Sequence, residues 1–548
     1  MTLDGFLTFL GLAAAIYAVV PSVAKLRANL GLRLQLLVAI CALILVLYLE
    51  FFDLVSQPCP KALGRACEWL YFPGDKSFTP PQLAFFVVLA WMGAAWLIHR
   101  YSRPGASLLP TLSRLVDDLV YERRFAEVLK LVEPFLPLID RAMHRRLFFQ
   151  RLHYRLLDLA GLNVIDPKHF LKRLEEPKTK SPLAERIMSF AKRRLGDMAV
   201  LIPSQGKAEE AAREIARVLL RSVELRRFIV QMRPYSALSL LKLRSFDRHD
   251  FAAGYFQGLL ADPASILYHE LRHNQSVSYG GCYSLPESNR LLHYLFTDAN
   301  TAIDLSVWKP IGDYVLANMR PDHPSKYFVQ LNGRSDNFDN EQWQDPTFAG
   351  IFFFDIMVRA AAHQGIEYHM WLFYLPLIVR ELEEGYDTSS PRIDLSDEFP
   401  TRSARLIYEA LRTVRDWVEL VEHLPEESPN RVIPDAYTMR DGTIPASAAL
   451  ALGQCMATIA LSKRLNEKFA LEMHDVIIGG IRNLGREGVQ GQMRSFLVAS
   501  IINGGRHGRD RDYGARLATL IAMSDPVLRY EIDDYEKALR AVYPKLQF

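Results

Sequence analysis

Three apolar runs occupy the first hundred residues of the chain. Residues 6–24 and 34–49 carry no charge, and residues 83–98 form a third uncharged run. With its semi-polar flanks, each run approaches the ~17 to 20 residues that cross a hydrocarbon core. Runs this apolar have no polar face to present to water. The pattern predicts three transmembrane helices, at about 5–24, 34–54 and 83–99, in a membrane anchor formed by residues 1–103.

From residue 107 onward the pattern becomes helical. Apolar residues recur at spacings of three and four, and we find no run with the alternation of a strand. The predicted fold class is all-α, with a large helical cytosolic region arranged as an irregular helical bundle or a degenerate α-solenoid. Turn-rich and charged stretches divide this region into two lobes, 104–332 and 347–548. The strongest helical patterns lie at 112–136, 207–232, 402–424 and 525–543.

Residues 350–379 are also strongly apolar. Asp355, Arg359 and Glu367 interrupt them, and the short apolar runs that remain are more typical of core helices than of a membrane span. We therefore predict that this segment holds the cytosolic region together. Residue types at helix ends agree with a helical fold, since Asn466 is a favourable N-cap and Asp525 before a proline favours a helix start.

The distribution of cations predicts the membrane topology. The start of the chain lacks the cations that precede the apolar stretch of a secretory signal peptide. Lys25, Arg27 and Arg33 lie in the first connection, and Arg100 and Arg103 follow the third run. By the positive-inside rule, the N-terminus faces outward and the residues after 100 are cytoplasmic. The expected location is the plasma membrane, or the inner membrane in a bacterium, as a multi-pass protein.

This topology bears on two of the five cysteines. Cys59 and Cys67 fall in the outer loop, where a disulfide can persist. Their spacing permits a disulfide without requiring one, so a disulfide and two free thiols both remain open. No cysteine lies in a Cys-x-x-Cys spacing typical of metal or redox sites.

Charge is balanced over the whole chain but not locally. The formal net charge is +3, while residues 141–194 contain fourteen Lys or Arg and five acids. Such a segment suits a solvated helix face, a surface of anionic lipid headgroups, or nucleic acid. Nucleic acid is the least favoured, because regular aromatic interleaving is missing. The candidate membrane-surface or anion-binding residues are Arg141, Arg145, Arg146, Lys172, Arg173, Lys192, Arg193 and Arg194.

A His-Glu-x-x-His pattern is the strongest candidate for catalysis. His269 and His273 are four residues apart, so on a helix they share a face and can bind Zn²⁺ together. Glu270 then stands where a general base would polarise a metal-bound water. Asp262 and Pro263 predict the start of the helix that the motif requires.

The surroundings of the motif weaken the zinc interpretation. Zinc peptidases with this pentapeptide usually keep uncharged residues before the second histidine, where this chain has Arg272. Leu267 and Leu271 form an apolar seam about 200° around the helix from the histidines, which should then face away from the core. Glu287, Asp298 and Asp304 are all available as a third ligand, and the sequence selects none of them.

Two glycine-rich segments, 479–494 and 503–512, are weaker candidates for ligand binding. Neither matches a phosphate-binding loop. Glycine with arginine can build an anion-binding nest, but turns that end helices use the same residues.

Together these features favour a membrane-tethered scaffold or sensor over an enzyme. Large helical surfaces without a marked reaction centre commonly bind partners, so we expect membrane lipid and either a protein partner or further copies of the chain. The spans are expected to oligomerise, and bacterial stress and phage-defence effectors share this general layout. No cofactor is expected. The alternative is a membrane-bound zinc metallopeptidase that uses His269, Glu270 and His273.

Overall fold

The computed structural model describes most of the chain, and its regular structure is helical. Within the described residues the one strand-like feature is an isolated antiparallel bridge between Val277 and Tyr283. The predicted all-α class is therefore confirmed for this part of the chain. The described residues are 8, 11, 15, 32–50, 80–101, 106–144, 155–156, 194, 206–273, 276–277, 281–336, 338–367, 370–435, 442–505 and 511–544.

The chain divides into two compact units, Met1–Leu219 and Leu220–Phe548. The predicted boundaries of the anchor and of the two lobes remain predictions. The helices of the first unit are α3 (Leu32–Glu50), α6 (Pro80–Tyr101), η2 (Ala106–Leu108), α7 (Leu109–Tyr121), α8 (Phe125–Val132), η3 (Glu133–Phe135), α9 (Leu136–His144) and α13 (Lys207–Arg221), of which α13 ends two residues into the second unit.

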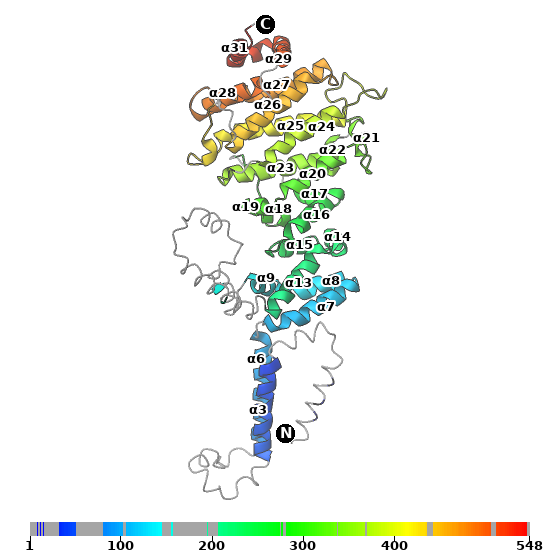
Figure 1. Cartoon of the computed structure of the whole chain (residues 1–548), viewed down its shortest axis with the longest axis vertical. Coiled ribbons are helices and arrows are strands. Elements are labelled where there is room, and N and C mark those ends of the chain that lie inside the picture. Colours follow the sequence, from blue (N-terminus) through cyan, green and yellow to red (C-terminus); the bar gives the residue numbers. More distant parts are fainter. Residues whose placement is uncertain are drawn as a thin grey trace. The chain divides into compact units, whose positions relative to one another are not determined.

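In the first unit, α3 packs along α6 (Figure 1). The seam between them consists of Val46 and Leu49 from α3 and of Ala84 and Val88 from α6, all at most 7% exposed. Outside this seam both helices remain apolar. Their large exposed apolar side chains are Leu36, Leu37, Ile40, Ile44, Leu45, Phe85, Phe86, Leu89, Met92, Trp96 and Leu97.

The structure does not show the three predicted membrane spans. The first falls almost entirely outside the described residues. The apolar parts of α3 and α6, Gln35–Leu49 and Gln82–Leu97, are shorter than 18 residues. Among the helices described, one is long and apolar enough to cross a membrane, Ile444–Leu461, and 83% of it is buried inside the protein. Such burial is typical of a core helix.

The helical pattern predicted over 112–136 is interrupted in the middle. α7 buries Leu112 and Val116, and α8 buries Val128 and Val132. Between them Arg123 adopts a left-handed backbone conformation, with φ of 58°, which a helix interior does not tolerate. The helical pattern predicted over 207–232 is also divided into two helices. Here the cause is an N-cap, because Ser222 accepts a hydrogen bond from the Leu225 N–H and starts a new helix.

In the second unit, successive helices pack on one another in chain order. α14 contacts α16, α16 contacts α20, α20 contacts α23, and α23 contacts α25; α25, α26, α28 and α31 continue the series, which Figure 1 shows from green to red. The helices are α14 (Val223–Met232), α15 (Ser236–Leu240), α16 (Arg248–Ala261), α17 (Ile266–His273), α18 (Arg290–Phe296), α19 (Asn300–Asp304), α20 (Trp308–Asn318), α21 (Tyr327–Leu331), α22 (Phe338–Glu341), η4 (Gln342–Gln344), α23 (Pro346–His363), η5 (Met370–Phe373), α24 (Tyr374–Glu384), α25 (Arg402–Glu419), η6 (Leu420–Glu422), η7 (Pro429–Arg431), α26 (Ile444–Leu461), α27 (Glu467–Asn483), α28 (Gly488–Ile502), α29 (Arg511–Met523), α30 (Pro526–Glu531) and α31 (Asp533–Val542).

Two apolar helices form the centre of this unit. α23 is buried over most of its length, which confirms for residues 350–363 the prediction that this apolar segment belongs to a core. α26 is buried too, and our sequence predictions do not single it out. Gly453 lets α26 approach α28 closely, because a Cβ there would lie 2.3 Å from the carbonyl oxygen of Ser500. Contact this close leaves room for no side chain at residue 453.

Side-chain caps fix where several of these helices begin. Asn466 accepts a hydrogen bond from the Phe469 N–H at the start of α27, and Asp525 accepts one from the Val527 N–H at the start of α30. Both caps are as predicted. Asp345 caps α23 through the N–H groups of Thr347 and Phe348. Each such cap satisfies backbone donors that the helix itself leaves unpaired.

Candidate functional site

The His-Glu-x-x-His motif lies on α17, which begins at Ile266. The prediction that Asp262 and Pro263 open this helix is wrong. The Asp262 carboxylate accepts a hydrogen bond from the Ala264 N–H, 2.9 Å away, and so closes a turn before the helix. The motif therefore occupies an eight-residue helix whose last residue is His273.

Glu270 points into the protein, where it caps another helix. Its side chain is 1% exposed. Oε2 accepts hydrogen bonds from the backbone N–H groups of Leu291 and Leu292, each 3.0 Å away, in the first turn of α18. Oε1 accepts the hydroxyl of Tyr235 at 3.0 Å. Asn289, the residue at the N-cap position of α18, makes no side-chain cap, so Glu270 supplies it.

This environment shifts the pKa of the Glu270 carboxyl. Burial raises the pKa of the Glu270 carboxyl, and the bonds from Leu292 and Leu291 partly oppose the rise. Both carboxylate oxygens are engaged by donors inside the protein, and His269 acts on the carboxyl electrostatically. Glu270 is thus a structural cap, and the general-base role considered from the sequence has no geometric support.

His269 and His273 lie on the opposite, exposed face of α17, as the apolar seam predicted. Leu267 and Leu271 are buried, at 0% and 1% exposure. Among the residues that the structure describes, no group of three or more His, Cys, Asp or Glu side chains is placed to hold a metal ion. A zinc peptidase centre needs a third protein ligand and a base, and the described geometry provides neither.

A shallow cleft of about 190 Å³ adjoins the motif. It lies between α17 and the segment that contains α22 and η4. His269 and Arg272 line it on one side, and Asn340, Trp343 and Gln344 on the other. The lining of the cleft is about equally polar and apolar, and of the two motif histidines His269 is the one that lines it.

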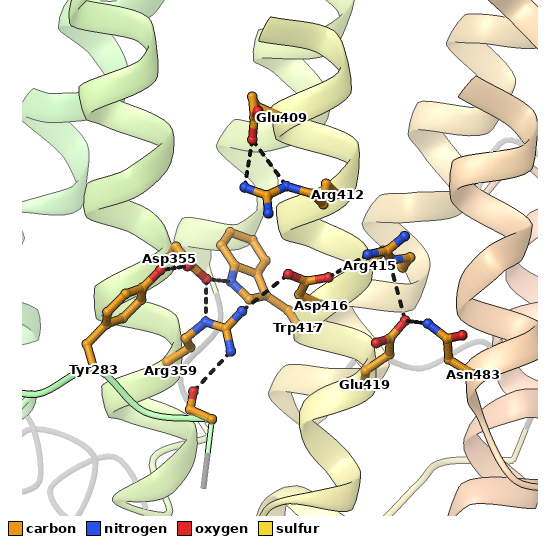
Figure 2. A network of polar contacts seen from close by, with 11 residues as sticks. Tyr283, Asp355, Arg359, Glu409, Arg412, Arg415, Asp416, Trp417, Glu419 and Asn483 are labelled. Carbon is orange, nitrogen blue, oxygen red and sulfur yellow. Dashed lines mark hydrogen bonds and ion pairs between the residues drawn. The ribbon is translucent and has the colours of Figure 1, made fainter. Parts of the chain in front are cut away.

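A second polar cluster lies inside the second unit and is centred on Asp355 of α23 (Figure 2). Asp355 Oδ1 accepts the Arg359 Nε–H and the Trp417 indole N–H, each at 2.7 Å. Asp355 Oδ2 accepts the hydroxyl of Tyr283 at 2.6 Å. Burial raises the pKa of Tyr283, and the Asp355 charge adds to the rise. Three donors therefore hold one buried carboxylate in place.

Arg359 carries the other charge of this cluster. Its Nη1 donates to the carbonyl of Gly281 at 3.0 Å, and its Nη2 lies 3.5 Å from a carboxylate oxygen of Asp416. Burial disfavours the charged guanidinium, but Asp355 outweighs burial, so the pKa of Arg359 is raised. Gly281 has φ of 77°, a left-handed conformation that suits glycine and directs its carbonyl to Arg359.

The cluster continues along α25 to α27. Arg412 pairs with Glu409 at 2.8 Å, and Arg415 pairs with Asp416 at 3.0 Å. Glu419 accepts a hydrogen bond of 2.9 Å from the side-chain amide of Asn483 in α27 (Figure 2). Charges on α23 and α25 are thus matched within the protein, and α27 contributes a neutral amide. These hydrogen bonds and ion pairs connect α23, α25 and α27.

Comparison with known proteins gives no family for this chain. No family model matches it, and neither the curated proteins nor the solved structures contain a significant match.

The glycine-rich segments pack and terminate helices within the described residues. Gly504 and Gly505, with φ of 57° and 70°, end α28 against α26. Arg494 is buried, and its guanidinium bonds Asp534 at 2.6 Å and the carbonyl of Leu484 at 3.2 Å. The predicted anion-binding role finds no support here, because Arg494 joins α28 to α31 and to the end of α27.

Most of the other predicted site residues lie outside the described residues. Arg141 and Arg194 are described and are exposed. The roles of the basic segment and of the cysteine pair remain predictions. The residues outside the described part are Cys59, Cys67, Arg145, Arg146, Lys172, Arg173, Lys192 and Arg193.

Proposed function

We propose that this protein is an integral membrane protein whose helical region binds a partner outside the bilayer, as a scaffold or sensor. The observation that carries the proposal is the apolar surface of α3 and α6. The two helices bury only one seam against each other, and eleven large apolar side chains on their other faces stay exposed. Contiguous apolar surface of this kind marks contact with membrane or protein.

Helix length supports a bilayer as the cover for this surface. α3 has 19 residues and α6 has 22, about 28 and 33 Å at 1.5 Å per residue, and their apolar parts, Gln35–Leu49 and Gln82–Leu97, make up about 22 and 24 Å of this. The hydrocarbon core of a bilayer is about 30 Å thick. Trp96, 63% exposed, lies near the end of α6, where tryptophan favours a membrane interface. In this proposal residues 6–24 form a third span, the N-terminus lies outside, and the region after residue 100 is cytoplasmic.

The chemistry of the helical region supports binding rather than catalysis. Glu270 caps a helix, and the charges around Asp355 and Arg359 are matched by neighbours. These helices expose a large surface on which polar and charged side chains are common. We propose that this surface recognises a protein partner or further copies of the chain, with oligomerisation through the spans, in the manner of a bacterial stress or phage-defence effector.

Alkaline carbonate extraction tests the membrane part of the proposal. The full chain should stay in the membrane pellet. The double variant Leu37→Lys/Leu89→Lys places two charges on exposed faces, at a cost of about 2.5 to 3.5 kcal/mol each in a bilayer centre, and should leave the pellet. Gln82→Lys, at an exposed polar position of α6, is the matched control and should behave as the wild type. Release of the wild type by carbonate would overturn the membrane assignment.

Cross-linking in intact membranes tests the scaffold part. We expect cross-links from the helical region to another protein or to a second copy of the chain. Cross-links found only within single chains, at native expression levels, would contradict it. The two tests are independent, since the chain can be membrane-bound and still lack a partner.

A further inference from the structure

We propose that His269 and His273 form a two-imidazole binding site for a divalent transition-metal ion such as Zn²⁺, separate from any hydrolytic activity. Both side chains are exposed on one face at the end of α17. Glu270 plays no part in the site, because its carboxylate is buried against α18. The two histidines of the motif are therefore available to a metal ion, whereas its glutamate is not.

The distance between the two rings is close to what chelation requires. Their centroids lie 4.2 Å apart, with 44° between the ring planes. Two imidazole nitrogens at about 2.1 Å from one ion, at the tetrahedral angle of about 109°, place the ring centroids about 5.3 Å apart. A separation about 1 Å larger than the observed one is therefore needed. Small rotations of two exposed side chains provide it.

The hydrogen bond of His273 fixes the nitrogen that can bind metal. Nδ1 of His273 lies 2.8 Å from the backbone carbonyl oxygen of His269. A carbonyl oxygen only accepts, so Nδ1 carries the proton and Nε2 of the neutral ring keeps its lone pair. Metal-binding histidines usually donate their second ring nitrogen in this way, which orients the ring and raises its basicity.

The surroundings of His269 and His273 determine which metal ions the site prefers and how tightly it binds them. The C-terminal end of a helix favours a cation, and imidazole suits Zn²⁺, Ni²⁺ and Cu²⁺ better than Mg²⁺ or Ca²⁺. Arg272 next to the pair opposes binding, and with two protein ligands the remaining coordination positions fall to water. The cleft lined by His269, Asn340 and Gln344 leaves space for those waters. The site should therefore bind an exchangeable ion rather than a permanent one.

Calorimetric titration of Zn²⁺ into the full chain tests the proposal. The protein is purified in detergent without a histidine tag and stripped with chelator. At pH 7.5 we expect one binding event that His269→Gln and His273→Gln each weaken about tenfold or more, since each variant converts chelation into binding by one imidazole. His144→Gln is the matched control, because Nδ1 of exposed His144 makes the same bond, to the carbonyl of Asp140 at 2.8 Å, without a partner imidazole.

A thermal melt separates metal binding from an effect on folding. Both variants should melt like the wild type in the absence of metal, because the replaced side chains are exposed. Binding that either variant leaves unchanged, or no binding by the wild type at millimolar Zn²⁺, would overturn the proposal. The proposed membrane scaffold would survive that result.

Discussion

Replacing Glu270 by alanine removes a buried helix cap, and the structure sets the cost. The substitution leaves the Leu291 and Leu292 N–H groups without their acceptor and deprives Tyr235 of its hydroxyl partner. Loss of a side-chain cap costs about 1 to 2 kcal/mol, and an unmade hydrogen bond at the partly buried tyrosine adds about 1 kcal/mol. The free energy of unfolding should therefore fall by about 2 to 3 kcal/mol.

Thermal unfolding of the full chain in detergent measures this loss. For a unit of roughly 330 residues, Leu220–Phe548, the unfolding entropy is about 0.7 kcal/mol per kelvin, so the expected decrease in Tm is about 3 to 4 °C. His269→Gln, on the exposed face of the same helix, is the control and should leave Tm unchanged. If Glu270 were a catalytic base and not a cap, Glu270→Ala would abolish activity and leave Tm unchanged. A Tm within about 1 °C of the wild type for Glu270→Ala would refute the capping role.

Four other substitutions, of which Gly479→Ala is a control, probe the interior of the second unit. Arg359→Ala leaves the Asp355 carboxylate buried and uncompensated, so urea unfolding should show a loss of about 3 to 5 kcal/mol; a loss below about 1 kcal/mol would contradict the pairing. Gly453→Ala forces α26 from α28 and should cost about 1 to 3 kcal/mol or more, whereas Gly479→Ala, whose Cβ would make only an ordinary 3.8 Å contact, should be neutral or slightly stabilising. Equal stabilities for these two variants would argue against the close crossing. Burial lowers the pKa of His474 below its ordinary 6.5. Below about pH 6.5 the unfolded chain therefore binds a proton that the folded chain does not. The free energy of unfolding should fall in this range by up to about 1.4 kcal/mol per pH unit. His474→Gln should reduce the difference in free energy of unfolding between pH 5.5 and pH 7, as measured by urea unfolding at both pH values. A variant that shows the same difference as the wild type would contradict the prediction.

Local patterns in the sequence predict the helices well and their interruptions poorly. Apolar spacing marks the regions of α7 with α8 and of α13 with α14, because amphipathic helices repeat every 3.6 residues. The break at Arg123 carries no such mark, since arginine is an ordinary helix residue that here adopts a left-handed conformation. Ser222 is a recognisable cap within a continuous pattern.

Long-range contacts explain what the sequence leaves open at the candidate site. The seam of Leu267 and Leu271 correctly places the histidines on the exposed face of α17. Glu270 accepts hydrogen bonds from the start of α18, about twenty residues further along the chain. No local sequence motif predicts this contact. The ion pair of Asp355 and Arg359 can be predicted from the sequence, because an acid and a base stand four residues apart within an apolar run. Its partner Trp417, 62 residues away, emerges only from the fold.

The central claim, that the exposed faces of α3 and α6 lie in lipid, is tested most directly by spin-label accessibility in lipid nanodiscs. Labels are attached at residues 37 and 89 of a chain whose native cysteines have been replaced. Oxygen concentrates in the hydrocarbon core and polar nickel complexes are excluded from it. We predict that both labels collide frequently with oxygen and rarely with a polar nickel complex, while a label at exposed Val329 shows the reverse. Labels at 37 and 89 that favour the nickel complex would contradict the account.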